Sequence, residues 1–397
     1  MKIKLFILMT IILTTGFFSF KDLDGCTTAI VSSDASLRKV PMLWKNRDTG
    51  TLSNKIIYVK EVPYSYIGIV NADETSGRFV YAGLNSEGFG IINTVAYNLP
   101  KVSDEMHDLE GQIMAEALRT CSRVDDFENY IKKNLGDTLG SWANFGVIDA
   151  YGGSKIFEVH NNGYKKLDTI KSPDKYFVNT NFSRTGKKGK GAGYLRFERA
   201  VKLFEKIPVK GITHEYIFQN ISRDFGHTLV KHPTVNELKE FPSNDPLWIH
   251  SSNCISRPST SGVVIINGKQ PDKKDSVATL WAILGEPVTS IAVPVWVEAG
   301  KVPLPLYEGK TAPICSEALR IKKIIHPFTE GAKKDYMNVT KLVNKDGKGF
   351  LPELLKTEKY IFKATAKFLK KKHTAEEYAA FQNKMAETAL KTLKKIE

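Results

Sequence analysis

Strand-like segments recur along the sequence between residues 26 and 298, and they constrain the fold more than any other feature. Runs rich in β-branched and aromatic residues alternate with Gly, Asn and Pro, which is the pattern of strands separated by turns. The predicted strands lie at residues 26–33, 40–48, 54–62, 65–72, 77–85, 88–97, 144–152, 154–161, 175–182, 257–268, 276–285 and 289–298. The first two, joined by a turn, form a predicted hairpin.

Helical periodicity appears in blocks between and after these strands. It predicts two helices within 103–134, further helices at 194–207 and 214–225, and a helical region from residue 316 onward. Strands and helices grouped in this way predict an α+β fold, with two sheets covered by helices. We expect one continuous domain over 26–397, in which about 316–397 is a basic helical C-terminal extension.

The first 25 residues read as a targeting segment rather than as part of the fold. Lys2 and Lys4 precede an apolar run from Leu5 to Phe20, and polar residues follow it directly. This order is typical of a secretory signal peptide, and the run is slightly short for a spanning helix of roughly 20 apolar residues. We therefore expect an exported protein, periplasmic or secreted, with a retained N-terminal anchor as the alternative.

The formal net charge of +14 and the pI near 9.3 favour encounters with anionic partners. The sequence has no zinc-finger spacing, no aromatic RNP strand and no GXXG loop, so nucleic acid is not an expected partner. The Lys-rich C-terminus is interpreted as the solvated face of a packed helix, with contact to an anionic envelope surface as the alternative. The histidines lack HExxH spacing, and we expect no metal and no cofactor. A homo-oligomer stays open.

Cys26 is the candidate nucleophile. It follows Gly25, opens the first strand and lies just past the predicted leader, so cleavage after Gly25 would make it the first residue. An N-terminal cysteine carries its own base, because an α-amine with an ordinary pKa of about 7.7–8.0 can take the thiol proton near neutral pH. Self-cleavage through an N-to-S acyl shift and cleavage by signal peptidase both stay open. Cys121 and Cys315 are interpreted as buried and inert.

The same cysteine also has a rival interpretation. Leu23-Asp24-Gly25-Cys26 partly matches a lipobox, in which the cysteine would carry a lipid. Asp24 is unusual at a position that normally holds a small uncharged residue, which favours the nucleophile. Lipidation would block both the thiol and the amine and would leave a lipid-anchored, non-catalytic binding protein.

Several motifs in order resemble the linear-amide carbon–nitrogen hydrolases of the N-terminal-nucleophile (Ntn) class. These include choloylglycine hydrolases, penicillin V acylases and isopenicillin-N acyltransferase-like (peptidase C45-like) enzymes. The matching segments are DGCTTAIVSS, PMLWKNRD, GIINTVAYN, KYFVNTNFS and SRPSTSGVVI. The resemblance runs from Cys26 to about Trp296 and implies a four-layer αββα sandwich with two antiparallel sheets.

The resemblance also implies roles for particular residues. Asp48 would accept a hydrogen bond from the α-ammonium or thiol of Cys26 and hold the pair in register. Asn181 and Asn93 would bind the oxyanion of the tetrahedral intermediate. Arg257 would lie near the cysteine, where it could stabilise the thiolate or bind a carboxylate.

Three further residues are assigned to substrate binding. Arg47 would neutralise Asp48 or bind a substrate carboxylate, with a surface ion pair as the alternative. Ser256 would orient Arg257, and Asn179 is the second choice to Asn181 as an oxyanion donor. Asn144 also matches a family element, but it opens a predicted core strand and is interpreted as structural.

These roles imply a cysteine-dependent amidase that acts on a small-molecule amide through an acyl-thioester. N-acyl amino acids, conjugated bile salts and penicillin V-like compounds all present linear amides. The basic, aromatic-rich composition favours an apolar acyl group joined to an acidic amine component. If an amine replaces water in the second step, the same site is an N-acyltransferase.

Overall fold

The computed structural model describes residues 25–101, 108–273 and 276–397. The predicted signal peptide, apart from Gly25, lies outside the described residues. So does the beginning of the predicted helical segment at 103.

Within this part of the chain, the strands form two large antiparallel sheets and one small one. The six-stranded sheet has the order β10-β1-β2-β12-β13-β14. Its strands are β1 (Thr27–Val31), β2 (Met42–Asp48), β10 (Tyr176–Asn179), β12 (Thr260–Asn267), β13 (Thr279–Leu284) and β14 (Val293–Val295). The predicted hairpin is β1 paired with β2, which places the segment after Cys26 in the middle of this sheet.

The seven-stranded sheet has the order β3-β4-β5-β6-β7-β8-β9 and is a simple meander. Its strands are β3 (Asn54–Val59), β4 (Tyr66–Asn71), β5 (Ala82–Asn85), β6 (Gly90–Val95), β7 (Trp142–Ile148), β8 (Ser154–His160) and β9 (Gly163–Asp168). The two sheets lie face to face, with β1 and β2 against β6 and β7. Buried aliphatic residues from both sheets fill the space between them, including Ile30, Ile92 and Ile148.

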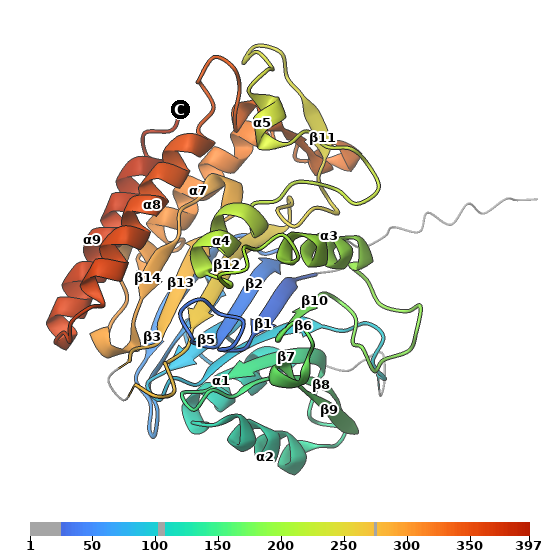
Figure 1. Cartoon of the computed structure of the whole chain (residues 1–397), viewed down its shortest axis with the longest axis vertical. Helices are drawn as coiled ribbons and strands as arrows, with labels where there is room; N and C mark the ends of the chain where they lie inside the picture. The colour runs from blue at the N-terminus through green and yellow to red at the C-terminus, as the bar shows by residue number, and fades with distance from the viewer. Residues whose placement is uncertain (1–24, 102–107, 274–275) are drawn as a thin grey trace, which may run out of the picture.

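Helices cover the outer face of each sheet (Figure 1). The α-helices are α1 (Glu110–Thr120), α2 (Val124–Asn134), α3 (Tyr194–Phe204), α4 (His214–Tyr216), α5 (Val235–Leu238), α6 (Leu304–Tyr307), α7 (Pro313–Ile325), α8 (Leu351–Phe368) and α9 (Ala375–Leu393). Helices α1 and α2 pack on the seven-stranded sheet through an aromatic cluster around Phe127, Phe145 and Phe157. The prediction of an α+β fold with two antiparallel sheets covered by helices is confirmed, and the layers have the order αββα.

Short helical turns connect the longer elements. They are η1 (Thr169–Lys171), the π-helical η2 (Ile217–Ile221), η3 (Pro287–Thr289), η4 (Val297–Ala299), η5 (Gly331–Asp335) and η6 (Val339–Lys341). The segment predicted as one helix at 214–225 is therefore a short α-helix continued by a π-helical turn.

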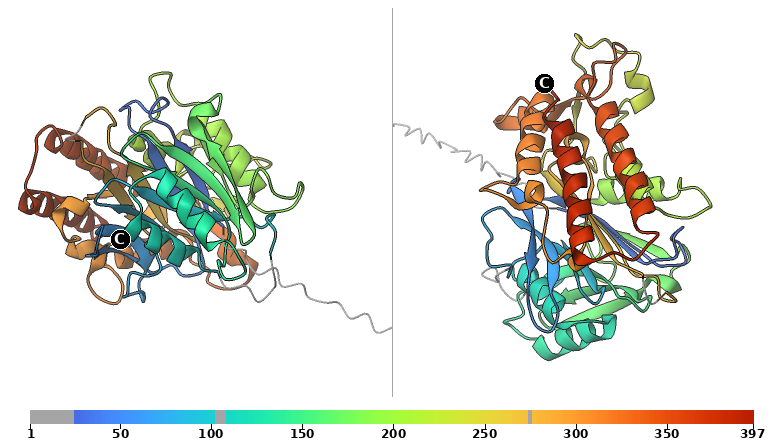
Figure 2. Two further views of the ribbon diagram at one scale, coloured as in Figure 1. Left: turned by 90° about the horizontal axis from the view of Figure 1, so that it is seen from below. Right: turned by 90° about the vertical axis from the view of Figure 1, so that its left-hand side faces the viewer.

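The C-terminal helices belong to the main core. Figure 2 shows α7, α8 and α9 side by side on one side of the molecule. Met385 and Leu393 of α9 pack in the same hydrophobic cluster as Trp281 of β13. The region from residue 316 is not wholly helical, because β15 (Tyr336–Asn338) pairs with β11 (Trp248–His250). Strands of three residues carry too little periodicity to be recognised in a sequence.

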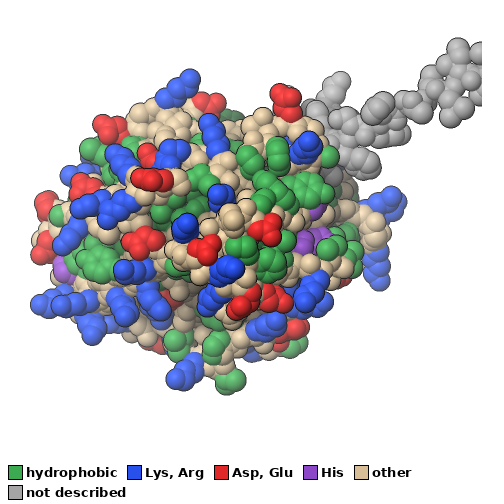
Figure 3. Space-filling view, turned by 90° about the horizontal axis from the view of Figure 1, so that it is seen from above, with side chains coloured by type: hydrophobic (Ala, Val, Ile, Leu, Met, Phe, Trp, Pro, Cys, Tyr) green, Lys and Arg blue, Asp and Glu red, His purple; other side chains and the backbone are tan. Residues whose placement is uncertain are grey.

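The surface carries both signs of charge. On the face in Figure 3, Lys and Arg side chains are interspersed with Asp and Glu. A search of the described helices finds none that is both long and apolar enough to cross a membrane.

Candidate active site

Cys26 lies at the end of the central strands of the six-stranded sheet. The strand that follows it, β1, pairs with β2 on one side and with β10 on the other. All four cysteines are free thiols, and Cys26 is half-buried whereas the others are buried. Burial raises the pKa of the Cys121 thiol to about 12 and also raises those of Cys254 and Cys315. These three thiols therefore stay protonated, which leaves Cys26 as the cysteine suited to act as a nucleophile.

Arg257 and Asp48 converge on the peptide that precedes Cys26. Arg257 Nη2 donates to the carbonyl oxygen of Gly25 at 2.8 Å, and Arg257 Nε donates to Asp48 Oδ2 at 2.9 Å. The other carboxylate oxygen of Asp48 accepts from Thr260 Oγ1 at 2.7 Å. Thr260 stands opposite Asp48 in the pairing of β12 with β2, so the sheet register brings these groups together.

Arg196 binds the backbone carbonyl of Cys26 itself. Its Nη1 donates to the Cys26 oxygen at 2.8 Å and to Thr27 Oγ1 at 2.9 Å. Its Nη2 donates to Asn181 Oδ1 at 2.8 Å, and the guanidinium lies 3.7 Å from Asp48 Oδ2. Burial, together with the nearby charge of Arg257, lowers the pKa of Arg196 to about 10, so it remains a cation at neutral pH.

One carboxylate is therefore shared by two arginines, and each arginine binds one carbonyl of the Gly25–Cys26 unit. The space around this peptide is tight. A Cβ atom added to Gly25 would lie 2.7 Å from Asn181 Oδ1, 2.8 Å from Arg196 Nη2 and 3.0 Å from Arg257 Nη2. Only glycine fits at residue 25 without displacing these groups.

A cavity of about 270 Å³ opens beside Cys26. Polar and charged side chains make up most of its described lining. The lining residues are Gly25, Cys26, Lys45, Arg47, Asp48, Thr49, Thr51, Asn71, Tyr81, Asn93, Val95, Asp108, Glu110, Gly111 and Asn181. Four of the five predicted catalytic residues, Cys26, Asp48, Asn93 and Asn181, thus line one cavity, and the fifth, Arg257, reaches Gly25 at its edge.

Lys45 connects Asn93 to the cavity wall. Its Nζ donates to Asn93 Oδ1 at 2.6 Å and to the Tyr81 carbonyl at 2.8 Å. Because Lys45 occupies the amide oxygen of Asn93, the amide nitrogen is left as the donor, as an oxyanion site requires. Burial lowers the pKa of Lys45, while the nearby Cys26 thiol acts in the opposite direction.

Arg47 lies on the cavity side of β2, like Lys45. It donates to Asn54 Oδ1 and, at 2.7 Å, to Asn71 Oδ1, and its guanidinium stacks 3.7 Å from the centre of the Tyr81 ring. The prediction that Arg47 neutralises Asp48 is not matched by these contacts, because adjacent strand residues point to opposite faces. Arg47 is buried, so the alternative of a surface ion pair is wrong.

Glu110 and Asp108 add an acidic pair to the cavity wall. Glu110 is fully buried at the start of α1, and its Oε1 accepts from the Trp142 backbone amide at 3.0 Å. Burial and the hydrogen bond to Asp108 raise the pKa of Glu110 well above its ordinary value of 4.5. When it holds its proton, the Glu110 carboxyl can donate a hydrogen bond to Asp108.

The other predicted residues have different positions. Asn181 Oδ1 accepts from Arg196, and Nδ2 donates one of its two N–H groups to the Val95 carbonyl at 3.0 Å, so the second N–H is the one that could bind an oxyanion. Asn179 accepts from Arg184 and is not among the lining residues of the cavity. Ser256 is buried, and among the described contacts its hydroxyl donates to Glu286 at 3.2 Å rather than to Arg257. Asn144 bridges Thr94, Phe182 and Ser183 as a structural residue.

Sequence reasoning missed Arg196, Lys45 and Glu110. A signal for Arg196 exists, because it lies on the same face of α3 as the buried Ala200 and Leu203. A charged residue on the apolar face of a helix needs a partner in the interior. Lys45 had a weaker signal, since it directly follows the apolar run from Val40 to Trp44 within a predicted strand.

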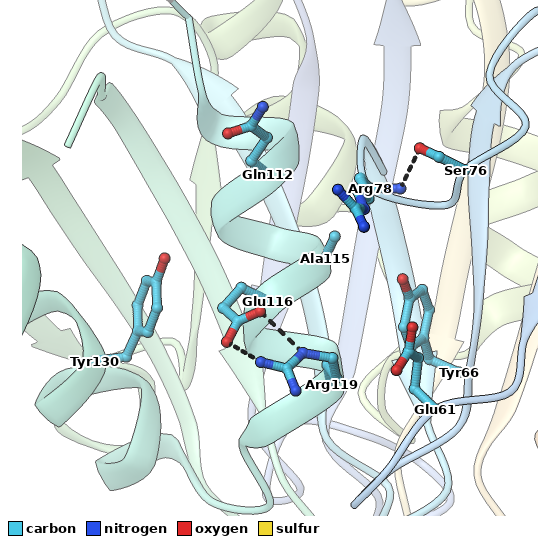
Figure 4. Close-up of a pocket in the computed structure, with 9 residues that line it drawn as sticks. All are labelled: Glu61, Tyr66, Ser76, Arg78, Gln112, Ala115, Glu116, Arg119 and Tyr130. Carbon is cyan, nitrogen blue, oxygen red and sulfur yellow. Dashed lines mark hydrogen bonds and ion pairs between the residues drawn. The ribbon is translucent and has the colours of Figure 1, made fainter. Parts of the chain in front are cut away.

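A second cavity, of about 570 Å³, lies on the outer side of the seven-stranded sheet. Figure 4 shows Glu116 and Arg119 paired along α1, with Tyr66, Arg78 and Glu61 across from them. This cavity has no cysteine and no histidine in its lining. Its greater size does not make it the better candidate for chemistry.

The fold and the cluster around Cys26 define a layered αββα protein with a cysteine at the start of a central strand. No model of a known protein family and no curated protein matches the sequence. Solved structures with similar folds include the Caenorhabditis elegans ortholog of N-acylethanolamine-hydrolyzing acid amidase. It has 11% identity and a TM-score of 0.41, over 63% of this chain and 95% of that one.

Two bacterial structures are similar to a comparable degree. A variant of the conjugated bile acid hydrolase from Clostridium perfringens has 12% identity and a TM-score of 0.38, over 68% of this chain and 92% of that one. Penicillin V acylase from Agrobacterium tumefaciens has 14% identity and a TM-score of 0.39, over 68% and 86%. These two are of the enzyme kinds that the sequence motifs resemble. At these identities, no residue's role is carried over from the neighbours.

Proposed function

We propose that this protein is an exported, cysteine-dependent amidase that hydrolyses a small linear amide through an acyl-thioester on Cys26. The observation that carries the proposal is the Gly25–Cys26 unit, whose two carbonyls are bound by Arg257 and Arg196 beside a polar cavity. The carboxylate of Asp48 lies beside both arginines and is their shared counter-ion.

The first reaction is the removal of the leader. Cys26 Sγ attacks the Gly25 carbonyl carbon, the thioester forms as the peptide bond to the Cys26 nitrogen breaks, and the thiol proton passes to that nitrogen, which becomes the free α-amine. Water then hydrolyses the thioester, which gives a Gly25 carboxylate and a free Cys26 thiol. Arg257 donates to the oxygen that becomes negatively charged, so it supports this step electrostatically.

The second reaction is turnover of the amide. The α-amine of the freed Cys26 takes the thiol proton, and the thiolate attacks the substrate carbonyl. Asn93 and Asn181 donate to the developing oxyanion, and the α-ammonium returns the proton to the leaving amine. Water hydrolyses the thioester and regenerates Cys26.

The cavity lining narrows the substrate class. A volume of about 270 Å³ lies just below the range of roughly 300–1,000 Å³ that is common for ligand pockets. The described lining holds the basic residues Lys45 and Arg47 and the acidic residues Asp48, Asp108 and Glu110, and Val95 and the Tyr81 ring supply its main apolar surface. These features favour a compact N-acyl amino acid over a conjugated bile salt.

Intact-mass measurement of the exported protein tests the proposal. We expect a chain that begins at an unmodified Cys26 and hydrolyses N-acyl amino acids. A diacylglyceryl adduct on Cys26 would identify a lipid-anchored protein and refute the amidase. Transfer of the acyl group to an added amine at the expense of hydrolysis would identify an N-acyltransferase instead.

The Cys26→Ala variant tests the nucleophile, with Cys121→Ala as its matched control. We expect Cys26→Ala to lose amide hydrolysis and cleavage after Gly25. Cys121 is buried against α1, away from the cavity, so its variant is expected to retain both reactions. Turnover by Cys26→Ala would exclude Cys26 as the nucleophile.

A further inference from the structure

A buried charged cluster lies behind the loop that carries Arg257. Glu286 follows β13 and is fully buried, with Lys322 Nζ and His326 Nε2 each 3.1 Å from its Oε2. Lys322 belongs to the last turn of α7, and His326 directly follows that helix. His326 Nδ1 lies 3.0 Å from the Tyr336 carbonyl, so the cluster also reaches β15.

The cluster holds the residues on both sides of Arg257. Glu286 Oε1 accepts from Ser256 Oγ at 3.2 Å. Lys322 Nζ donates to the Pro258 carbonyl. Arg257 itself is thus fixed by its two neighbours from behind, while its guanidinium projects to Asp48 and Gly25 in front.

The charges of the cluster are mutually dependent. Burial alone would raise the pKa of Glu286, but Lys322 and His326 hold it at about 2. A carboxylate so deeply buried is costly unless its partners are in place. The three side chains are therefore expected to stay together in the folded protein, and such a cluster is suited to fix the position of the loop that carries Arg257.

We propose that Glu286, Lys322 and His326 are positioning residues that set the place of Arg257 at the Gly25–Cys26 peptide. The proposal rests on the proposed function of the site. It gives the helical C-terminal region a role in that chemistry, since α7 supplies Lys322 and ends directly before His326. The chain from residue 316 onward would then be part of the catalytic unit and not an accessory.

Glu286→Gln and Lys322→Met are the test variants, and Asp149→Asn is the control. Asp149 is another buried carboxylate, but it accepts backbone amides of Val124, Tyr151 and Gly153 at the far end of the seven-stranded sheet. All variants are compared at matched folded fractions, measured by thermal unfolding. If Glu286→Gln does not fold, the double variant Glu286→Gln/Lys322→Met removes both charges and relieves the unpaired lysine.

We expect the test variants to slow cleavage after Gly25 and to lower kcat roughly 10²-fold, the size of effect that a displacement of about 1 Å can have. KM is expected to change less than kcat, because in the processed enzyme Arg257 acts through Asp48 beside Cys26 and is not among the lining residues of the cavity. Glu286→Asp should recover part of the rate, whereas Asp149→Asn should lose stability without this loss of kcat.

Alkylation of the Cys26 thiol by iodoacetamide distinguishes a failure of the proposed amidase function from a failure of the proposed positioning of Arg257. If the wild-type protein has no amidase activity, the proposed function fails, and a changed alkylation rate in Glu286→Gln but not in Asp149→Asn still supports positioning. Equal cleavage, kcat and alkylation rates in wild type and both test variants would overturn the positioning role. An equal loss of kcat in Asp149→Asn would also overturn it, because the effect would then be general destabilisation.

Discussion

The two faces of strand β2 carry different side chains near Cys26. On the helix side, Asp48 is enclosed by Arg196, Arg257 and Thr260, and every contact is directed at the Gly25–Cys26 unit or its supports. On the side facing the other sheet, Lys45 and Arg47 border a cavity. One face therefore holds the Gly25–Cys26 unit in place, and the other supplies Lys45 and Arg47 to the cavity that Cys26 and Asp48 also line.

This division suggests that processing and turnover use different parts of the site. The carbonyl oxygen of Gly25 is bound by Arg257 on the helix side of β2. The candidate oxyanion donor Asn93 belongs to the cavity side. Variants on the two faces should thus separate leader cleavage from amide hydrolysis.

The largest effect is expected for Asp48→Asn. The neutral amide leaves Arg196 and Arg257 without their shared counter-charge, so both carbonyl contacts are weakened. We expect a loss of about 3–5 kcal/mol of unfolding free energy, as for other broken buried ion pairs. Both reactions should slow by roughly 10⁴-fold, the size known for orienting carboxylates in catalytic triads. Chemical denaturation and the rates of cleavage and turnover measure these changes, and normal rates in a folded variant would refute the role of Asp48.

The next effect concerns Asn93→Ala on the cavity side. Loss of one oxyanion donor typically raises the barrier by about 2.7–4 kcal/mol, so kcat should fall roughly 10²–10³-fold. Cleavage after Gly25 should continue at nearly its normal rate, because that carbonyl is bound by Arg257. The processed fraction is read by mass and kcat by amide hydrolysis. Equal slowing of both reactions would remove the distinction between the two faces.

Sequence patterns predicted much of this arrangement, and the gaps have physical causes. The long strands and Cys26, Asp48, Asn181 and Arg257 were identified because local periodicity and ordered motifs report them. Strand β9 was missed because it is an edge strand with exposed lysines, which hide the alternation of apolar and polar residues that marks a strand. Arg196 was missed because its importance comes from contacts with residues far along the chain. Such contacts depend on how the layers stack, and a local pattern does not contain that information.

A smaller and more selective effect is expected for Gly25→Ala. The added methyl group would meet three polar side-chain atoms at 2.7–3.0 Å. Overpacking of this kind costs about 1–3 kcal/mol, so self-cleavage should slow by about tenfold or more. The mature enzyme no longer contains residue 25, so its kcat should equal that of the wild type. Unchanged processing of this variant would indicate that an external peptidase removes the leader.

The smallest effect concerns the stability of the cavity wall and its dependence on pH. The folded pKa of Glu110 is raised above its ordinary 4.5, so the folded state binds this proton more tightly than the unfolded chain. The stabilisation is complete below pH 4.5 and is lost as the pH rises through the folded pKa. Glu110→Gln keeps the acceptor for the Trp142 amide and can donate to Asp108 at every pH.

Wild type and Glu110→Gln should therefore have similar unfolding free energies at pH 4, and the variant should be the more stable of the two at pH 8. Urea unfolding across this range measures the difference. A variant that is less stable at pH 8 would mean that Glu110 is ionised in the folded protein, and the cavity would then carry a second negative charge beside Asp108. That result would argue against an acidic substrate in the cavity. The contacts of Asp48 on the helix side of β2 would be unaffected.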